Sequence, residues 1–328
     1  MRPWASIAAA MRILLCGSRS GALSDECAAR PLSHRCQPLS PAAALLDCWF
    51  GTRVGVLGGS ANTVVSMTPK PHDSGHTHAH AGPHGPDLAR LLDLDAIVQR
   101  PALEQALATV ADLVGTDTPR RILDIGAGTG TGSVALARLF PTAEVVAVDI
   151  DERMLERVRA RARSERVADR VSTVAADASA DEWSLGTADL IWSAVALHEV
   201  SDAPKALDNL FSSLRSGGLI VIVEMDAPPL VIPDTAAESE PEQEQHLRPA
   251  EPRRSPAFDH PDWSAGLAAA GFESLITRTL VTDHRMPADG PAGEYAALER
   301  RRTGQPELVG ADQLHIRGTR TLWAARRP

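Results

Sequence analysis

Residues 121–133 read RILDIGAGTGTGS, and this stretch decides the fold. An apolar run enters it, four glycines alternate through the turn, and the amphipathic segment Val134–Phe140 leaves it. This order predicts a buried strand, a tight glycine turn and the N-terminus of a helix. Because glycine has no Cβ, a ligand can lie directly against the backbone of such a turn. Asp124 precedes the first glycine by two residues, at the end of the strand, where a carboxylate can meet an ammonium group.

The spacing of the glycines argues against a dinucleotide site. The dinucleotide fingerprint G-x-G-x-x-G needs its third glycine for close packing of helix and strand. Counted from Gly126 that position holds Thr131, and counted from Gly128 it holds Ser133. The pattern that fits is D-x-G-x-G-x-G. A nicotinamide-dependent oxidoreductase therefore stays only as a less favoured alternative.

A second acid ends the next predicted strand. Val145–Val148 is an apolar run suited to a strand buried on both faces, and Asp149 follows it, 25 residues after Asp124. In nucleotide-binding α/β folds, an acid at such a strand end accepts hydrogen bonds from ribose hydroxyls. The alternative is that Asp149 or Asp151 caps the following helix, since aspartate is a favoured N-cap residue. We assign Asp149 to the ribose and Asp151 to the cap.

Predicted strands and helices continue to alternate as far as Glu224. Further strands are predicted at Val171–Ala176, Ala188–Ser193 and Leu219–Glu224, with a helix at Ala203–Arg215. Such alternation gives a parallel sheet with helices on both faces, and ligands bind outside the carboxyl ends of its strands. Asp177 follows the third strand, 28 residues after Asp149. We therefore expect Asp124, Asp149 and Asp177 to meet at one edge of the sheet.

Two segments carry a resemblance to a known family. The D-x-G-x-G-x-G pattern at residues 124–130 and LRSGGLIVIVE at 214–224 resemble two motifs of the class I S-adenosylmethionine-dependent methyltransferases. The second motif is L-x-P-G-G-x-L-x-x-x-E in that family, and Ser216 replaces its usual proline. The resemblance covers about Leu88 to Arg326. It implies a Rossmann-like, doubly wound α/β sheet of seven mostly parallel strands, with helices on both faces and an antiparallel last strand.

The resemblance also implies S-adenosylmethionine as the cofactor. The expected cofactor-binding residues are Asp124, Gly126, Ala127, Gly128, Gly130, Asp149, Ile150, Asp177, Ala178 and Ser193. In the family, the acid at the position of Asp177 accepts from the adenine amine, and the N–H of the next residue, Ala178, meets the ring. A solvated loop aspartate is the alternative for Asp177.

His198 is the candidate catalytic residue. It lies with Glu199 in the loop after the fourth predicted strand, which faces both cofactor and substrate in the family. A histidine there can act as a general base when the methyl acceptor must lose a proton. It can also merely orient the substrate, and a structural role, such as a hydrogen bond to the following loop, stays open as the alternative.

The two ends of the chain differ in composition. Residues 1–66 hold all four cysteines and carry a net charge of +3. Because the whole chain carries −9, residues 67–328 carry −12. We interpret 1–66 as a disordered extension or a wrongly assigned start, and 67–86, with five histidines, as a flexible leader rather than a metal site. The methyltransferase-like domain is then 87–328. Within it, the Pro- and Glu-rich segment 227–256 is expected to be a mobile insertion that serves as a lid or a linker.

Several absences narrow the methyl acceptor. No cysteine follows Met67, which disfavours mechanisms that need a cysteine nucleophile. Ser193–Ala196 lacks the Asn/Asp-Pro-Pro-Tyr/Phe motif of amino-nitrogen methyltransferases, which disfavours that class of enzyme. The acidic charge disfavours a nucleic-acid partner, because phosphate binding needs basic patches. No run of 18 apolar residues exists, so no spanning helix is expected. The sequence thus predicts a cytoplasmic methyltransferase for a small organic acceptor, or alternatively a non-catalytic module that binds the cofactor or a metal.

Overall fold

A computed structural model describes residues 86–234, 261–306, 308 and 310–328. The predicted extension 1–66 and almost all of the predicted leader 67–86 lie outside the described residues, as does most of the insertion expected at 227–256. Among the described residues, no helix is both long and apolar enough to cross a membrane.

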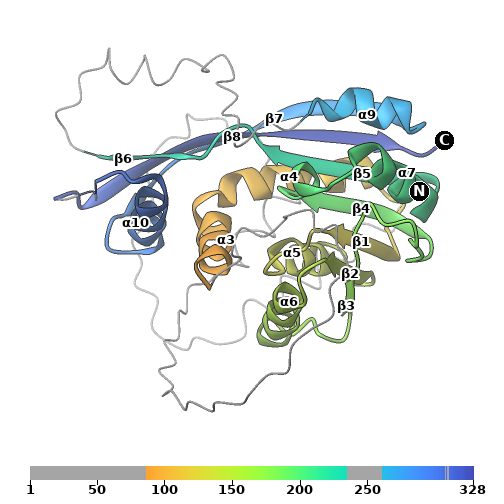
Figure 1. The fold of residues 1–328 in the computed structure, drawn as a ribbon, viewed down its shortest axis with the longest axis horizontal. Helices are drawn as coiled ribbons and strands as arrows, with labels where there is room; N and C mark the ends of the chain where they lie inside the picture. The colour runs from red at the N-terminus through yellow and green to blue at the C-terminus, as the bar shows by residue number, and fades with distance from the viewer. Residues whose placement is uncertain (1–85, 235–260, 307, 309) are drawn as a thin grey trace, which may run out of the picture. The chain divides into compact units, whose positions relative to one another are not determined.

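The described chain is built on one sheet of eight strands in the order β3-β2-β1-β4-β5-β8-β6, with β7 also paired to β8 (Figure 1). The strands are β1 (Arg121–Ile125), β2 (Glu144–Asp149), β3 (Val171–Ala175), β4 (Ala188–Ala194), β5 (Leu214–Met225), β6 (Leu230–Pro233), β7 (Glu273–Pro287) and β8 (Gln313–Arg326). Strands β1 to β5 pair in parallel, and β8 runs antiparallel to β5. The predicted doubly wound sheet with an antiparallel last strand is confirmed, but the described sheet has eight strands where seven were expected.

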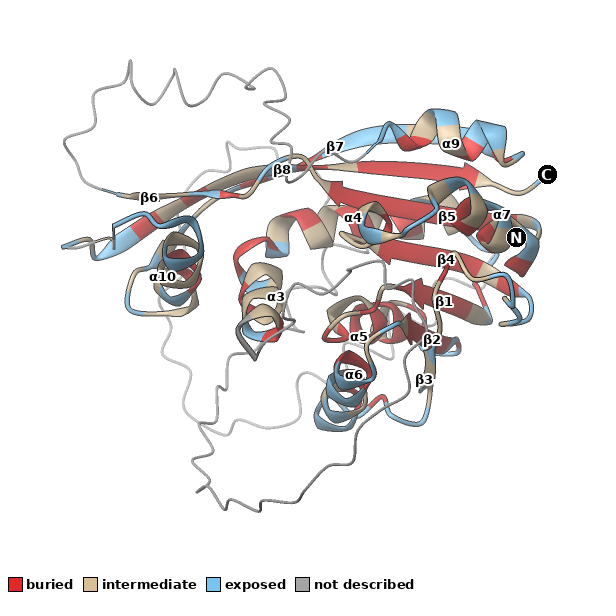
Figure 2. Cartoon of the chain, in the orientation of Figure 1, coloured by how far each residue is buried: buried red, intermediate tan, exposed pale blue. Residues whose placement is uncertain are grey.

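Helices cover both faces of this sheet. They are α3 (Pro86–Val98), α4 (Arg100–Val114), α5 (Thr131–Leu139), α6 (Glu152–Ser164), α7 (Ala203–Ser213), α9 (Trp263–Ala269) and α10 (Pro291–Thr303), with a single 3-10 turn, η1 (Leu197–Glu199), after β4. One buried cluster joins α4 and α5 to the sheet, and a second joins α7 and α9 to its other face. In Figure 2 the buried residues concentrate on β1, β4, β5 and the adjoining half of β8.

Three elements depart from the sequence expectations. The helix predicted over Ala203–Arg215 ends at Ser213, because Leu214 is buried and already begins β5. Part of the segment expected to be a mobile insertion is regular, since Leu230–Pro233 forms β6 and pairs antiparallel with β8. The helix α10 was not predicted, because its second half, LERRRT, lacks an apolar period; three residues of its first half are buried.

Candidate active site

The glycine turn lies at the carboxyl end of β1, as predicted, and its shape depends on missing side chains. Gly126 has φ +67°, and a Cβ there would lie 2.2 Å from the Cβ of Ala196, in the loop after β4. Gly130 has φ +85°, and a Cβ there would lie 3.0 Å from the Cα of Val158 on α6. The turn therefore fits closely between the β4 loop on one side and α6 on the other.

Asp149 joins the tip of β2 to this turn. Its Oδ2 accepts a hydrogen bond from the N–H of Gly128 at 2.8 Å, and its Oδ1 accepts one from the N–H of Asp151 at 2.9 Å. Asp151 caps α6 by accepting from the N–H of Arg153 at 2.9 Å, which confirms that Asp151, and not Asp149, is the cap. Beside them, the apolar side chain of Ile150 is 73% exposed. The β2 tip thus presents a carboxylate and an uncovered apolar surface side by side.

Asp177 and Ala178 follow β3, the neighbour of β2 in the sheet. Asp177 Oδ1 accepts from the N–H of Ser179 at 2.8 Å and from its hydroxyl at 2.7 Å, which forms a compact turn. Ala178 is buried, and its carbonyl accepts from the Asn209 side chain at 2.9 Å. Asp177 is thus part of an ordered turn beside the β2 tip.

Asp124 is placed differently from what the sequence suggested. Its carboxylate is 2% exposed and accepts a hydrogen bond from the Ser133 hydroxyl at 2.5 Å, beneath the first turn of α5. The reason is strand alternation: Leu123 and Ile125 belong to the cluster on the α7 face, so Asp124 faces α5. Burial raises the pKa of Asp124 to about 7, the hydrogen bond from Ser133 opposes this rise, and the charge of Asp149 adds to it.

Two further expected cofactor residues support the turn with buried groups. The Ser193 hydroxyl, on β4, is buried and donates to the carbonyl of Ile125 at 3.0 Å. Ala127 is buried, and its N–H donates to the carbonyl of Val148 at 3.0 Å. Both residues tie the glycine turn to a neighbouring strand, one to β4 and the other to β2.

His198 lies on η1, directly after β4. Its Nδ1 is 2.8 Å from Oε2 of Glu224, a fully buried residue near the end of β5, and its Nε2 is 3.2 Å from Oε1 of Glu199. Burial lowers the pKa of His198, but the hydrogen bond and charge of Glu224 and the charge of Glu199 outweigh it, so the pKa is raised above 6.5. The ring therefore contacts both a neighbouring strand, through Glu224, and the residue that follows it, Glu199.

Sequence reasoning missed two residues of this site. Glu224 did carry a signal, because it is the only acid at the end of the otherwise apolar run Leu219–Val223. Val195 carried none, yet its φ of +54° is one that a β-branched residue seldom adopts. Its N–H donates to the carbonyl of Val223 at 2.7 Å, and its left-handed conformation turns the chain from β4 into η1.

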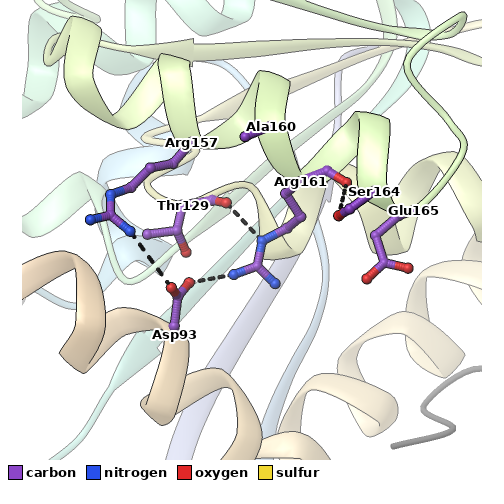
Figure 3. A pocket seen from close by; sticks show the side chains of 7 residues that line it. All are labelled: Asp93, Thr129, Arg157, Ala160, Arg161, Ser164 and Glu165. Carbon is purple, nitrogen blue, oxygen red and sulfur yellow. Dashed lines mark hydrogen bonds and ion pairs between the residues drawn. The ribbon is translucent and has the colours of Figure 1, made fainter. Parts of the chain in front are cut away.

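Helix α3 covers the glycine turn from the outside. A Cβ on Gly128 would lie 3.5 Å from Cδ1 of Leu92. Asp93 pairs with Arg161 of α6, and Arg161 Nε donates to the carbonyl of Thr129 at 2.9 Å. Asp93, Thr129 and Arg161 are among the residues that line a hollow of about 390 Å³ between α3, the turn and α6 (Figure 3). Its arginines are already paired, so the hollow marks where α3 is fastened and not where chemistry occurs.

Comparison with known proteins now identifies the family. The chain matches a methyltransferase-domain family over residues 122–218. It is 30% identical to malonyl-[acyl-carrier protein] O-methyltransferase of Xylella fastidiosa over 222 residues, covering 66% of this chain and 71% of that protein. It is 34% identical to demethylmenaquinone methyltransferase of Clavibacter sepedonicus over 220 residues, covering 60% of this chain and 82% of that protein. The chain belongs to the class I S-adenosylmethionine-dependent methyltransferases.

A third relative matches a shorter stretch of the chain. Demethylmenaquinone methyltransferase of Thermus thermophilus is 35% identical over 118 residues, which is 36% of this chain and 53% of that protein. This methyltransferase therefore uses S-adenosylmethionine, as the sequence predicted. Around its glycine turn, Asp149, Ile150, Asp177 and Ala178 lie on adjacent strand tips, whereas the side chains of Asp124 and Ser193 are enclosed. Among the described residues, no group of three or more His, Cys, Asp or Glu could hold a metal ion.

Proposed function

We propose that this methyltransferase holds S-adenosylmethionine across the tips of β1, β2 and β3 and methylates a small organic molecule. The observation that carries the proposal is Asp149, which is bonded to the N–H of Gly128 beside the uncovered side chain of Ile150. Each carboxylate oxygen of Asp149 has capacity for a second hydrogen bond, so both can accept from ribose hydroxyls. Ile150 offers the adenine ring an apolar face, with Asp177 and the N–H of Ala178 at its edge.

The enclosed residues contribute to this site without touching the ligand. Asp124 fixes Ser133 and the first turn of α5, and Ser193 holds the end of β1. Gly126 and Gly130 keep the backbone close to its neighbours, and the lack of side chains lets the methionine part of the cofactor lie against the turn. We therefore place the direct contacts of the cofactor on the β2 and β3 tips and on the turn's backbone.

The acceptor is the less defined half of the proposal. The first two relatives described above are named for malonyl-[acyl-carrier protein] and for demethylmenaquinone, and neither acceptor is a nucleic acid. The charge of −9 over the whole chain also disfavours a polyanionic partner. Bound S-adenosylmethionine supplies an electrophilic methyl group, and the chain's part is to align the acceptor, exclude water and remove a proton. His198 is the residue we propose for that last step. A cytoplasmic location stays a prediction.

Calorimetry with S-adenosylhomocysteine and with NADH tests the cofactor. We expect S-adenosylhomocysteine to bind and NADH not to bind. The Asp149→Ala variant should lose about 2 kcal/mol of binding free energy, because buried ribose hydroxyls lose a charged acceptor. Equal affinity of the variant would remove the ribose assignment. Binding without transfer of a labelled methyl group to any component of a metabolite extract would favour the non-catalytic alternative.

A further inference from the structure

We infer that Glu224 is a positioning residue that holds His198 ready to remove a proton, so that the acceptor is a molecule whose reacting atom is protonated at neutral pH. Phenolic and enolic hydroxyls and acidic C–H groups belong to this class, whereas a carboxylate does not. The inference rests on the proposed function, and it adds to it a second residue and a chemical class of acceptor.

The first support is the placement of Glu224. Strands β4 and β5 are parallel neighbours, with Ala194, the last residue of β4, opposite Val223, so Glu224 lies level with the chain that leaves β4. Glu224 Oε2 lies 2.8 Å from His198 Nδ1, and its Oε1 is buried and has no hydrogen-bond partner in the described structure. A buried carboxylate with one partner is costly, and its cost falls when that partner is a cation.

The second support is the direction in which the imidazole points. An ionised Glu224 only accepts hydrogen bonds, so His198 must donate to it from Nδ1. In the neutral ring the free electron pair is then on Nε2, the nitrogen on the other side. The only contact of Nε2 within the described structure is with Glu199, whose side chain is 80% exposed and can move into solvent when an acceptor arrives.

The third support is the backbone that carries the histidine. Val195 accepts an unfavourable φ of +54°, and strain of this kind persists where the surroundings enforce it. The bend that results has two consequences at once. It seats Ala196 against Gly126 of the cofactor turn, and it brings His198 to Glu224. The proton acceptor and the glycine turn are therefore fixed to each other by one short segment.

The chemical step follows from this arrangement. As the reacting atom of the acceptor bonds to the methyl carbon, the electron pair of the broken carbon–sulfur bond goes to sulfur. The proton of the reacting atom goes to Nε2 of His198. The imidazolium that forms is paired with Glu224 and then releases its proton to solvent past Glu199. The charged groups that act on the ring are Glu224 from β5 and Glu199 from its own turn. Both hold its pKa above the ordinary value, so transfer should rise with pH through that pKa.

The tautomer of His198 is the first test, because it is measured on the wild-type protein with the buried pair intact. In ¹⁵N NMR of the full chain bound to S-adenosylhomocysteine, at a pH above the pKa of His198 and with the signal assigned by His198→Gln, we expect a neutral ring protonated at Nδ1. A ring protonated at Nε2 overturns the inference. If S-adenosylhomocysteine does not bind, the proposed function fails instead, and the two failures are thereby distinguished.

Glu224→Gln is the second test. It keeps the size of the side chain and removes its charge, so the pKa of His198 should fall and methyl transfer should drop by about 10-fold or more. Glu156→Gln, an exposed residue on α6, is the matched control and should leave both unchanged. Equal His198 pKa values in Glu224→Gln and wild type overturn the positioning role. If Glu224→Gln does not fold, Glu199→Gln serves, and it too must lower the pKa of His198.

Two probe acceptors test the chemical class. We expect labelled methyl transfer to 1,4-dihydroxynaphthalene, whose hydroxyls are protonated at neutral pH, at a rate that rises with pH. We expect no methyl ester to form on a malonyl thioester, because its carboxylate is already ionised. Transfer to the thioester in preference, or to neither probe, overturns the assignment of the acceptor class.

Discussion

Asp124→Asn separates a supporting role for this carboxylate from a ligand-binding one. Burial under α5 raises the pKa of Asp124 from 3.8 to about 7. Between these values the folded protein holds a proton that the unfolded chain has lost. The stability contributed by this group is therefore complete below pH 3.8 and is lost as the pH rises to about 7. At about 1.4 kcal/mol for each pH unit, the loss is about 4 kcal/mol.

Asparagine has the same shape, accepts the Ser133 hydrogen bond and does not titrate. As the pH rises from acid to neutral, the free energy of unfolding of the wild type should therefore fall by about 4 kcal/mol relative to that of Asp124→Asn. Urea unfolding in a pH series, followed by tryptophan fluorescence, measures this difference. Asp208→Asn, on the exposed side of α7, controls for the loss of a carboxylate as such and should show no comparable trend.

The outcome also bears on the cofactor. A carboxylate that is 2% exposed and bonded to Ser133 cannot reach an ammonium group unless that hydrogen bond breaks. We therefore expect S-adenosylhomocysteine to bind Asp124→Asn with an affinity within about 3-fold of wild type, which is less than 1 kcal/mol. A difference in stability that stays constant with pH refutes the burial argument, and a loss of affinity of about 100-fold refutes the supporting role.

Three further substitutions test the geometry around the turn. Gly126→Ala places a methyl group 2.2 Å from the Cβ of Ala196 at a left-handed φ, and it should lower the free energy of unfolding in urea by about 3 kcal/mol. Gly304→Ala, at φ +69° with open space around it, is the control and should lower it by about 1 kcal/mol. Equal losses would contradict the close packing of Gly126. Val195→Gly should relieve the backbone strain and raise the free energy of unfolding by about 1 kcal/mol. It should also lower the rate of methyl transfer, and an unchanged rate would mean that the bend does not position His198. Asp93→Asn should destabilise the fold by about 1 kcal/mol in dilute buffer and less in about 1 M NaCl; a cost independent of salt would rule out an ion pair as the fastening of α3.

The fold could be predicted because its determinants are local and repeated. Each of the five parallel strands contains a short apolar run, and Gly or Asp follows the first three, so the alternation of strands and helices predicts a parallel sheet. Strand β6 and helix α10 escaped because their signals are weak in isolation. β6 is four residues long, and it is a strand because β8 extends beyond β5 and offers it a pairing edge. α10 has few apolar residues and is held by packing against α3.

The site was predictable only where function follows from position along a strand. The sequence placed Asp149 at the end of β2 and Asp177 after β3, and both carboxylates accept hydrogen bonds from backbone N–H groups outside the strands, Asp149 from Gly128 and Asp177 from Ser179. Asp124 lies one residue inside the end of β1, where alternation decides its face, and the apolar runs on both sides of the sheet gave no sign of which face it would take.

The pair of His198 and Glu224 shows what a linear pattern cannot carry. The two residues are 26 positions apart, and their contact requires that β4 and β5 be neighbours in one register and that the chain bend sharply after β4. The order of strands supplies the first condition and was predictable. The second depends on a valine in a conformation that valine normally avoids, so propensity argues against the very bend that is needed. The conformation of Val195 is unfavourable by itself, so contacts made elsewhere must stabilise it. The bend creates two such contacts, that of Ala196 with Gly126 and that of His198 with Glu224.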